Sequence, residues 1–402
     1  MQNFFNIMKH FKIQPILVIL ATLMLLHHTI NAQQPFSRYH VQSRGDLTEG
    51  CRHLMLEVDA SGFFFDAEYA TPAAKGFTAT GVSLTPTLLF GVNERAQLRV
   101  GFQAQMLAGM DSLQHLRPIL TLIYQPSRWL SLTAGTLQGW HRSRMGHALL
   151  DPSVPLLHPN EEGLQIMTRT RHWRSDTWLD WYHYLKPWTP DQERFTMGSM
   201  HEAILYLRQG FQVGVPLLFL ANHRGGEVKT IDTNTVTTFN ESVGLEVRYR
   251  WQNSLNARSN DLTLNMPLLF YHLEDTELDH GGWAFHPTLA YQTTLINKNE
   301  LSGLDLLCRA GYWHGNHFFS THGSPLFWSI NPYTALHMPP SAATPDADVR
   351  NLLTATVSLG HQFKNLHCGL QVDAIHDFDM AKTDFTFSFF LRFDESFLLR
   401  SE

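Results

Sequence analysis

The chain has 402 residues, of which 44% are hydrophobic, 12% aromatic and 16% charged, and its formal net charge is −6. This apolar and aromatic content excludes a disordered chain, and the lack of a basic excess excludes nucleic acid as a partner. Only one long apolar run is present, which excludes a bundle of transmembrane helices. The charged fraction lies well below the roughly 25% of soluble domains. The chain therefore has more apolar surface than a soluble domain of this size, and something must shield that surface from water.

The first 32 residues have the pattern of an export signal. Lys9 and Lys12 precede an apolar run from Ile16 to Leu26, and the small residue Ala32 ends the segment. A cationic start, a short apolar run and a small residue are typical of a secretory signal peptide. The run is shorter than the ~20 residues that cross a bilayer as a helix, although an N-terminal anchor helix is the alternative. We predict a signal peptide over 1–32 and a periplasmic segment over 33–53.

From residue 54 onward, apolar and polar residues alternate with a period of two. Residues 97–106 show this most clearly, because Leu98, Val100, Phe102, Ala104 and Met106 share one face. The same alternation recurs over 243–251, 353–360 and 385–393. Each run has about ten residues, the length of a tilted strand that crosses a bilayer. The pattern therefore predicts membrane-crossing strands.

Sixteen such strands can be placed in chain order. Their expected ranges are 54–69, 77–91, 95–108, 113–125, 129–138, 163–173, 176–186, 195–208, 210–221, 235–251, 261–273, 282–297, 300–313, 350–363, 366–377 and 383–393. We predict an all-β fold, an antiparallel transmembrane β-barrel over 54–393 with about 16 strands, within a range of 14 to 18, followed by a C-terminal tail over 394–402.

The connections between these strands alternate in length. Links after even-numbered strands are mostly tight, with 252–260 as the exception, whereas links after odd-numbered strands are longer, as at 139–162 and 314–349. Short periplasmic turns and long extracellular loops are typical of outer-membrane barrels. A soluble β-sandwich or propeller would also alternate in polarity. However, its loop lengths would not alternate over sixteen strands, and no repeat of ~40–50 residues is visible.

The cysteines do not form a disulfide framework. Cys51, Cys308 and Cys368 are an odd number, so at most one bridge can form. Cys308 and Cys368 fall on strands that are not neighbours, about 10 Å apart, which exceeds the reach of a disulfide. We expect these two thiols to be free.

The chain resembles porin-like outer-membrane proteins of Gram-negative bacteria. The resemblance is carried by Ala134–Leu137, Asp151-Pro152, Glu162–Gln165 and Asp176–Trp181, a stretch similar to poorly characterised barrels of the Bacteroides group. The aromatic-rich last strand is similar to the signal that barrel-assembly machinery reads, although Asp394–Glu402 continue beyond it. The resemblance implies an outer-membrane location in a Gram-negative bacterium. It also implies contacts with membrane lipid, lipopolysaccharide and the assembly machinery, and it leaves open a homotrimer.

If the apolar face meets lipid, the polar face lines the lumen. The candidate pore-lining residues are Arg99, Arg117, Arg169, Arg171, Asp180, Glu202, Arg208, Glu246, Arg248, Arg250, Asp305, Arg309 and Asp373. Arginine keeps its charge and its planar group pairs with carboxylates and phosphates. This set predicts a transverse field that attracts anions or orients polar solutes. The alternative is a network of ion pairs that only hydrates and stiffens the wall.

The connection 139–162 follows the fifth strand, where the resemblance to sixteen-stranded porins implies a loop that folds inward and narrows the channel. Its candidate constriction residues are His141, Arg142, Arg144, His147, Asp151, Glu161 and Glu162. Glu161 and Glu162 facing Arg142 and Arg144 would make an eyelet of opposed charges. An exposed loop with ordinary solvated charges is the alternative.

Two further clusters of side chains are candidates for binding a ligand. His314, His317 and His322 suggest a metal site, but their spacing matches no closed site, so we expect no metal and no other cofactor. Trp178, Tyr182 and Tyr184 are expected to point inward, where aromatic faces could stack on sugars, while Trp181 points to lipid and Trp188 lies in a loop. The alternative for the aromatic set is the girdle that marks the membrane interface.

The primary hypothesis is an outer-membrane channel that passes small hydrophilic solutes and is not an enzyme. The first alternative is a barrel plugged by its loops, with a role in secretion or surface assembly. The second is a lipid-modifying hydrolase, because a serine–histidine pair on a barrel wall could cleave lipid and such sites are recognised by geometry. Ser143 near His141 or His147 is the candidate pair.

Overall fold

The computed structural model describes residues 53–401 apart from 140, 185–191, 226–234, 254–257, 276–278, 298–301 and 331–347. The strands are β1 (His53–Glu68), β2 (Phe77–Asn93), β3 (Ala96–Leu107), β4 (His115–Ser127), β5 (Leu130–Thr136), β6 (Glu162–Arg169), β7 (Trp173–His183), β8 (Glu193–Arg208), β9 (Phe211–Gly225), β10 (Val236–Asn253), β11 (Arg258–Asp275), β12 (Asp279–Phe285), β13 (Thr288–Asn297), β14 (Ser302–Asn316), β15 (Val349–Phe363), β16 (Leu366–Asp377) and β17 (Lys382–Ser401). Short helices are η1 (His141–Ser143), α4 (Val154–Leu157) and η2 (Pro325–Phe327).

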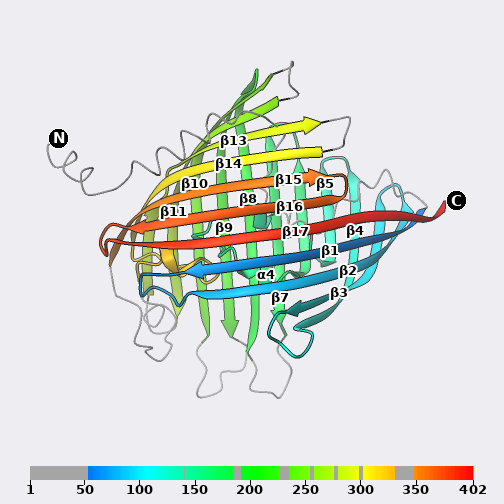
Figure 1. The fold of residues 1–402 in the computed structure, drawn as a ribbon, viewed down its shortest axis with the longest axis horizontal. Coiled ribbons are helices and arrows are strands. Elements are labelled where there is room, and N and C mark those ends of the chain that lie inside the picture. Colours follow the sequence, from blue (N-terminus) through cyan, green and yellow to red (C-terminus); the bar gives the residue numbers. More distant parts are fainter. Residues whose placement is uncertain are drawn as a thin grey trace.

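The strands form one closed antiparallel sheet (Figure 1). Apart from β12 and β13, consecutive strands pair with each other, and β1 pairs with β17 to close the barrel. β12 and β13 both lie between β11 and β14, so they are two halves of one strand, interrupted at His286-Pro287. A proline has no N–H to give to a ladder, which explains the break. The barrel therefore has sixteen membrane-crossing strands, and the predicted fold class is confirmed.

The two faces of the wall have the polarity that the alternation predicted. Val100, Phe102 and Met106 of β3 are exposed on the outer face, whereas Arg99 and Gln103 are buried on the inner face. Phe385, Phe387 and Phe389 of β17 are likewise exposed. Exposure of so many large apolar side chains to water would be unfavourable. A membrane removes this cost, because its acyl chains cover the outer face of the barrel.

Several predicted boundaries differ from the structure. The link expected over 252–260 is short, because β10 ends at Asn253 and β11 begins at Arg258, so it is no exception to the tight links. The tail expected over 394–402 does not form, because β17 continues to Ser401 and pairs with β1 up to His53. This extra pairing satisfies backbone groups that a free tail would leave to solvent. The predicted signal peptide and most of the periplasmic segment lie outside the described residues.

Loops fill part of the lumen. The connection 137–161, which includes η1 and α4, packs against the inner wall, where Gln105 donates from Nε2 to the carbonyl oxygen of Leu156 at 2.7 Å. The segment 317–330, which includes η2, also folds inward, and its Phe318, Phe319 and Phe327 are almost fully buried. Together with wall residues these segments form a continuous apolar cluster. Part of the barrel interior is therefore a dry core instead of a wet channel.

Cys308 and Cys368 are free thiols, as predicted, because β14 and β16 are separated by β15. Cys51 lies outside the described residues. Within the described ranges, no helix is long and apolar enough to cross a membrane.

Candidate functional site on the barrel wall

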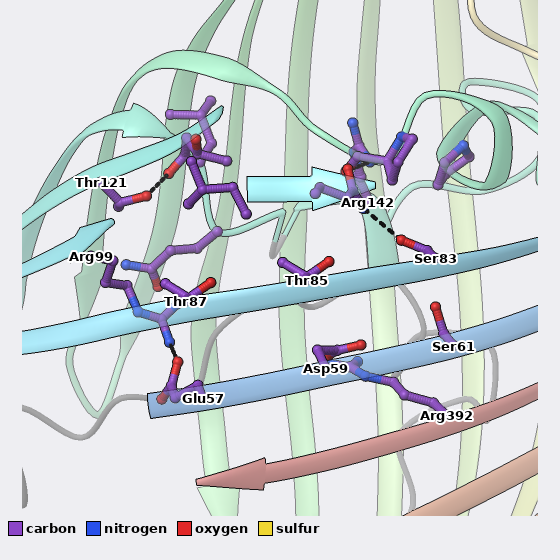
Figure 2. Close-up of a pocket in the computed structure, with 17 residues that line it drawn as sticks. Glu57, Asp59, Ser61, Ser83, Thr85, Thr87, Arg99, Thr121, Arg142 and Arg392 are labelled. Carbon is purple, nitrogen blue, oxygen red and sulfur yellow. Dashed lines mark hydrogen bonds and ion pairs between the residues drawn. The ribbon is translucent and has the colours of Figure 1, made fainter. Parts of the chain in front are cut away.

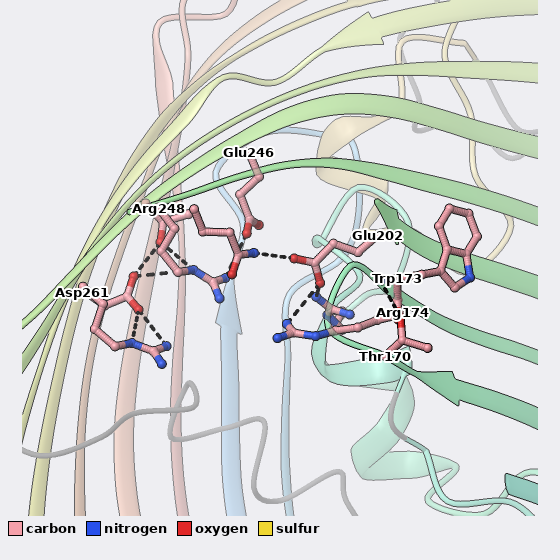
Figure 3. A network of polar contacts seen from close by, with 11 residues as sticks. Thr170, Trp173, Arg174, Glu202, Glu246, Arg248 and Asp261 are labelled. Carbon is pink, nitrogen blue, oxygen red and sulfur yellow. Dashed lines mark hydrogen bonds and ion pairs between the residues drawn. The ribbon is translucent and has the colours of Figure 1, made fainter. Parts of the chain in front are cut away.

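The charged residues of the lumen are mostly paired with one another. Glu202 is 3% exposed and accepts hydrogen bonds from Arg144 at 2.6 Å, from Arg174 at 3.3 Å and from Gln212 at 2.7 Å (Figure 3). Arg248 forms an ion pair with Glu246 at 3.1 Å on the same strand. Paired charges hold the wall together and contribute less field to the lumen than isolated ones would.

Most of the predicted pore-lining residues face inward. Asp305 accepts from Thr294 at 3.0 Å, Asp373 accepts from Thr356 at 2.7 Å, and Arg250 pairs with Asp261 at 3.0 Å. The others on the inner face are Arg99, Arg117, Arg169, Asp180 and Arg309. These positions agree with the predicted inner face, and a role for them in acting on a solute stays a prediction.

Two predicted pore residues do not line the lumen. Arg171 lies in the turn between β6 and β7, outside any strand. Arg208 follows a bulge at Leu205 and is paired with Phe211, whose side chain is exposed on the outer face. Directly opposed residues of antiparallel strands share a face, so the extra residue turns Arg208 outward. A bulge cannot be predicted from alternation alone.

Only one pair of the predicted eyelet of opposed charges forms, between Glu161 and Arg142. Glu161 pairs with Arg142 of its own loop at 2.9 Å, and Arg144 pairs with Glu202 of the wall. Glu162 begins β6 and is exposed, so it does not face these arginines. His147 and Asp151 join the two lumen loops instead, since the His147 carbonyl accepts from the Ser324 N–H and the Asp151 N–H donates to the His322 carbonyl. The loop is therefore held by an ion pair within itself, an ion pair with the wall and backbone hydrogen bonds to the second lumen loop.

His141 lies at the base of this loop and is fully buried. Its Nε2 is 2.9 Å from a Glu161 oxygen and its Nδ1 is 3.5 Å from Asp176, while its ring stacks on Trp178 at 3.7 Å between centroids. Burial opposes the charged form, but the two carboxylates outweigh it and raise the pKa of His141 to about 9. An imidazolium held between carboxylates cannot serve as a general base near neutral pH. We infer that His141 has a structural role and holds the loop against the wall.

His322 and its neighbours do not form a metal site. His322 is buried, its Nε2 lies 3.0 Å from Thr196 Oγ1, and burial lowers its pKa to about 4. His314 bonds Asn351 at 2.8 Å on the outer face, and His317 lies near Asp348 at 3.3 Å. Among the residues that the structure describes, no group of three or more histidine, cysteine, aspartate or glutamate side chains could hold a metal ion.

The aromatic residues divide between the two faces. Trp178 points inward and is buried, and Trp181 is exposed on the outer face against Phe195, both as expected. Tyr182 contacts His322 edge-on at 6.2 Å between ring centroids. Tyr184 is among the most exposed aromatic side chains, and Trp188 lies outside the described residues. None of these rings forms a stacking platform in the lumen within the described ranges.

Three hydroxyl–imidazole arrangements lie on the lipid-facing wall within the described residues, and alternation along the chain predicts none of them. One is His376 of β16 with Thr383 of β17, at 2.9 Å. The second is Ser199 and His201 of β8, where Ser199 Oγ lies 2.7 Å from His201 Nε2 and 2.7 Å from Thr177 Oγ1. Thr177 lies midway along the outer face of β7 between Trp173 and Trp181, so this pair is at the depth of the acyl chains. The i, i+2 spacing of Ser199 and His201 places both side chains on one face of a strand, and this signal is visible in the sequence.

The third arrangement lies at the end of the barrel wall, on three adjacent strands. His223 of β9 has its Nδ1 2.9 Å from Thr237 Oγ1 of β10, and its Nε2 3.8 Å from a Glu193 oxygen of β8. Phe195 of β8 stacks on the His223 ring at 4.8 Å between centroids. We call Glu193, His223 and Thr237 the rim triad. Its members are far apart in sequence, and only the strand register brings them together.

The rim triad lies where the wall meets the long loops. Glu193 is the first residue of β8, Thr237 is the second of β10, and His223 is the third from the end of β9. On the same outer face, Phe195 lies opposite His223 in the β8–β9 ladder, and Leu217 is exposed. The triad thus combines a hydroxyl, an imidazole and a carboxylate at the boundary between headgroups and hydrocarbon.

Comparison with known structures returns outer-membrane proteins at low identity. OprB of Pseudomonas putida matches with a TM-score of 0.47 and 8% identity, covering 86% of this chain and 94% of OprB. OprD of Pseudomonas aeruginosa matches with a TM-score of 0.45 and 9% identity, covering 88% of this chain and 99% of OprD. OmpT of Vibrio cholerae matches with a TM-score of 0.43 and 8% identity, covering 88% and 100%. At these values the likeness says nothing about function. No curated protein matches the chain.

The closed barrel with its apolar outer face is an outer-membrane protein of a Gram-negative bacterium, as the sequence predicted. The link to barrels of the Bacteroides group stays a prediction. A family model described as Lipid A 3′-O-deacylase-type matches residues 47–402. A deacylase is an enzyme, so the prediction that the chain is not an enzyme is wrong, and the lipid-modifying alternative is better supported than the channel. The chain belongs to the Lipid A 3′-O-deacylase-type family.

Proposed function

We propose that the protein hydrolyses an ester-linked acyl chain of a lipid A-type glycolipid, and that the rim triad is the catalytic site. The single observation that carries this proposal is the contact of Thr237, His223 and Glu193 on the lipid-facing wall. The family membership supports the reaction class. The location supports the substrate, because the ester bonds of a membrane lipid lie at the boundary of the hydrocarbon.

The chemistry follows from the three groups. Nδ1 of His223 accepts the proton of the Thr237 hydroxyl as its oxygen attacks the ester carbonyl carbon. The imidazolium then gives that proton to the sugar oxygen as the ester C–O bond breaks. Water, deprotonated by the same imidazole, hydrolyses the acyl-threonine and releases a fatty acid. The 3.8 Å separation between Glu193 and Nε2 is an ion-pair distance, and such contacts shorten in the reacting complex.

Two other histidines fit the reaction less well. His141 is fully buried in the lumen and held as a cation, so it has neither access to lipid nor a free basic nitrogen. His201 reaches a serine on the outer face, but no carboxylate contact is described for it and it lies among the acyl chains, deeper than an ester. Depth and the presence of a carboxylate therefore favour the rim triad.

The test uses purified barrels in vesicles of lipid A and measures released fatty acid. His223→Ala and Thr237→Val should lower the rate at least a hundredfold, and Glu193→Gln should lower it about tenfold or more, as expected for groups in proton transfer. Thr237→Ser should retain activity. His376→Ala is the matched control. His376 and Thr383 form a similar contact at 2.9 Å on the adjacent strands β16 and β17, on the other side of the barrel from the rim triad.

Full activity in His223→Ala would overturn the assignment of the site. If activity were instead lost in Ser199→Ala and kept in the rim variants, catalysis would belong to the deeper pair. A folded barrel that releases no fatty acid from any lipid A would overturn the proposed function itself.

A further inference from the structure

A polar cavity lies in the lumen, apart from the rim triad, between β17, the strands β1 to β5 and the loop that carries α4 (Figure 2). The space between the lining residues is about 810 Å³ when the part that is open to solvent is counted with it. On the wall side, facing pairs of β1 and β2 form a grid, with Glu57 opposite Thr87, Asp59 opposite Thr85 and Ser61 opposite Ser83. Opposed residues share a face, so all six side chains point inward.

The charges of this cavity are balanced. Arg99 donates to Glu57, and Arg392 pairs with Asp59. Arg142, the third arginine in the lining, is bound to Glu161 at 2.9 Å and to the Pro159 carbonyl oxygen at 2.8 Å. Carboxylates and guanidinium groups that already pair leave no net field to attract an ion. The cavity therefore favours a neutral ligand over an anion or a cation.

The hydrogen-bonding groups of the cavity are only partly used. Within the described part of the chain, the hydroxyl groups of Ser61, Thr85 and Thr87 make no hydrogen bond, and Thr87 is 6% exposed. Gln103, 4% exposed, donates from Nε2 to Ser83 Oγ at 3.2 Å, and its carbonyl oxygen has no partner in the described part of the chain. Polar groups in so enclosed a place are costly unless something bonds to them.

The opposite side of the cavity combines apolar side chains with Thr121, Thr136, Gln138 and Arg142. Ile119 of β4, Leu137, and Pro155 and Pro159 of the loop face the grid of hydroxyls and carboxylates. A ligand with hydrogen-bonding groups along one edge and C–H groups on one face would satisfy both sides. A pyranose ring has these two properties, and its hydroxyls can bond to paired carboxylates, guanidinium groups and threonines at once.

We propose that this cavity binds a neutral saccharide. The site is independent of the rim triad, because its lining lies inside the closed wall and the rim triad lies outside it. The saccharide can be a free sugar or a sugar unit of a larger glycan, and both offer the same hydroxyl pattern.

The experiment measures binding of free neutral disaccharides to the folded full chain in detergent, by saturation-transfer NMR and equilibrium dialysis. We expect maltose or di-N-acetylglucosamine to bind, and glucose 6-phosphate to bind more weakly. The double variant Thr85→Val, Thr87→Val keeps the side-chain volume and removes two hydroxyls, so it should weaken binding about fivefold for each lost bond. Ser358→Ala is the control, because Ser358 is an inward hydroxyl of β15 outside this cavity.

The binding measurements with different saccharides distinguish the possible outcomes. Binding of free disaccharides that the double variant weakens supports the site, and competition by a soluble glycan then identifies the larger source. No binding of any free or glycan-borne saccharide to a folded barrel would show that the cavity holds water only, and would overturn the proposal. Tighter binding of the phosphate sugar, or equal binding by the double variant, would also overturn it. None of these readouts depends on release of fatty acid, so the proposed function can fail or hold separately.

Discussion

The neighbours of a histidine decide whether it can act as a general base or only holds a loop in place, as His141 and His223 illustrate. His141 and Glu161 form a buried pair in which Arg142 also holds the carboxylate. Burial acts against the charge of Glu161, but Arg142 and His141 outweigh it and lower its pKa to about 2. His223 has no such enclosure and keeps one nitrogen on a hydroxyl, which is the requirement for a base.

The His141 pair predicts a pH-dependent attachment of the loop. Because the pKa of His141 is raised from 6.5 to about 9, its contribution is complete below pH 6.5 and is lost as pH rises through 9. Glu161 contributes above pH 4.5 and loses its contribution only as pH falls through about 2. Hydrogen exchange of a peptide covering 139–150, corrected for intrinsic rate, should show about tenfold less protection at pH 10 than at pH 7.

The matched variant for that measurement is His141→Asn, which removes the titrating group and should remove the difference between the two pH values. Equal protection of the unmodified chain at both pH values would contradict the assigned role of His141.

Gly135 provides a second test at the scale of one residue. Its φ of +97° is one that other residues rarely adopt, and an added Cβ would lie 1.8 Å from the Leu120 carbonyl oxygen. Gly135→Ala should lower the urea midpoint of unfolding clearly. The alanine would have to keep an unfavourable positive φ, and the backbone at Leu120 would have to move away from the added Cβ. Gly109→Ala is the control, since Gly109 also has a positive φ but no neighbour within 4 Å. Equal midpoints for the two variants would show that the contact does not matter.

At the scale of elements, the loop 137–161 is joined to the wall by a few specific contacts. Arg144 reaches Glu202 of β8, and Gln105 of β3 reaches the backbone of α4. The sequence predicted that this loop folds inward, since the resemblance to porins placed it after the fifth strand. It could not predict the partners, because Glu202 and Arg144 are 58 positions apart and their contact depends on strand register.

Removal of Glu202 tests this attachment. Glu202→Ala takes the shared acceptor away from Arg144, Arg174 and Gln212, leaving their donors without it in a nearly closed site. We expect trypsin to cleave after Arg142 or Arg144 several times faster in this variant than in Glu246→Ala, which breaks a pair that does not involve the loop. Unchanged cleavage would mean that the loop is held mainly by its apolar contacts.

For the whole molecule, the strand count and the two faces follow from alternation, and the tight links follow from turn chemistry. The sixteen expected strands match the sixteen that form, including 282–297, which the structure divides at Pro287. Three features were beyond the pattern: the bulge that turns Arg208 outward, the pairing of β17 beyond residue 394, and the rim triad. Each depends on register between strands, which alternation alone leaves open.

The apolar cluster inside the barrel predicts how the molecule conducts ions. Phe318, Phe319 and Phe327 pack with Trp313 and Leu352 in the interior, so the full chain should give little steady current in planar bilayers. A deletion within 317–330 that keeps the barrel folded should raise the current several-fold. A large, steady current through the full chain would show that the plug does not close the lumen, and would return the channel hypothesis to first place.

The central claim is that ester hydrolysis takes place on the outer face of the wall, at Glu193, His223 and Thr237. Its most direct test is mass spectrometry of lipid A recovered from vesicles that contain the protein. The full chain should remove one acyl chain, and Thr237→Val should leave the lipid intact while Thr237→Ser still removes it. Loss of the acyl chain at the same rate with Thr237→Val would contradict the claim.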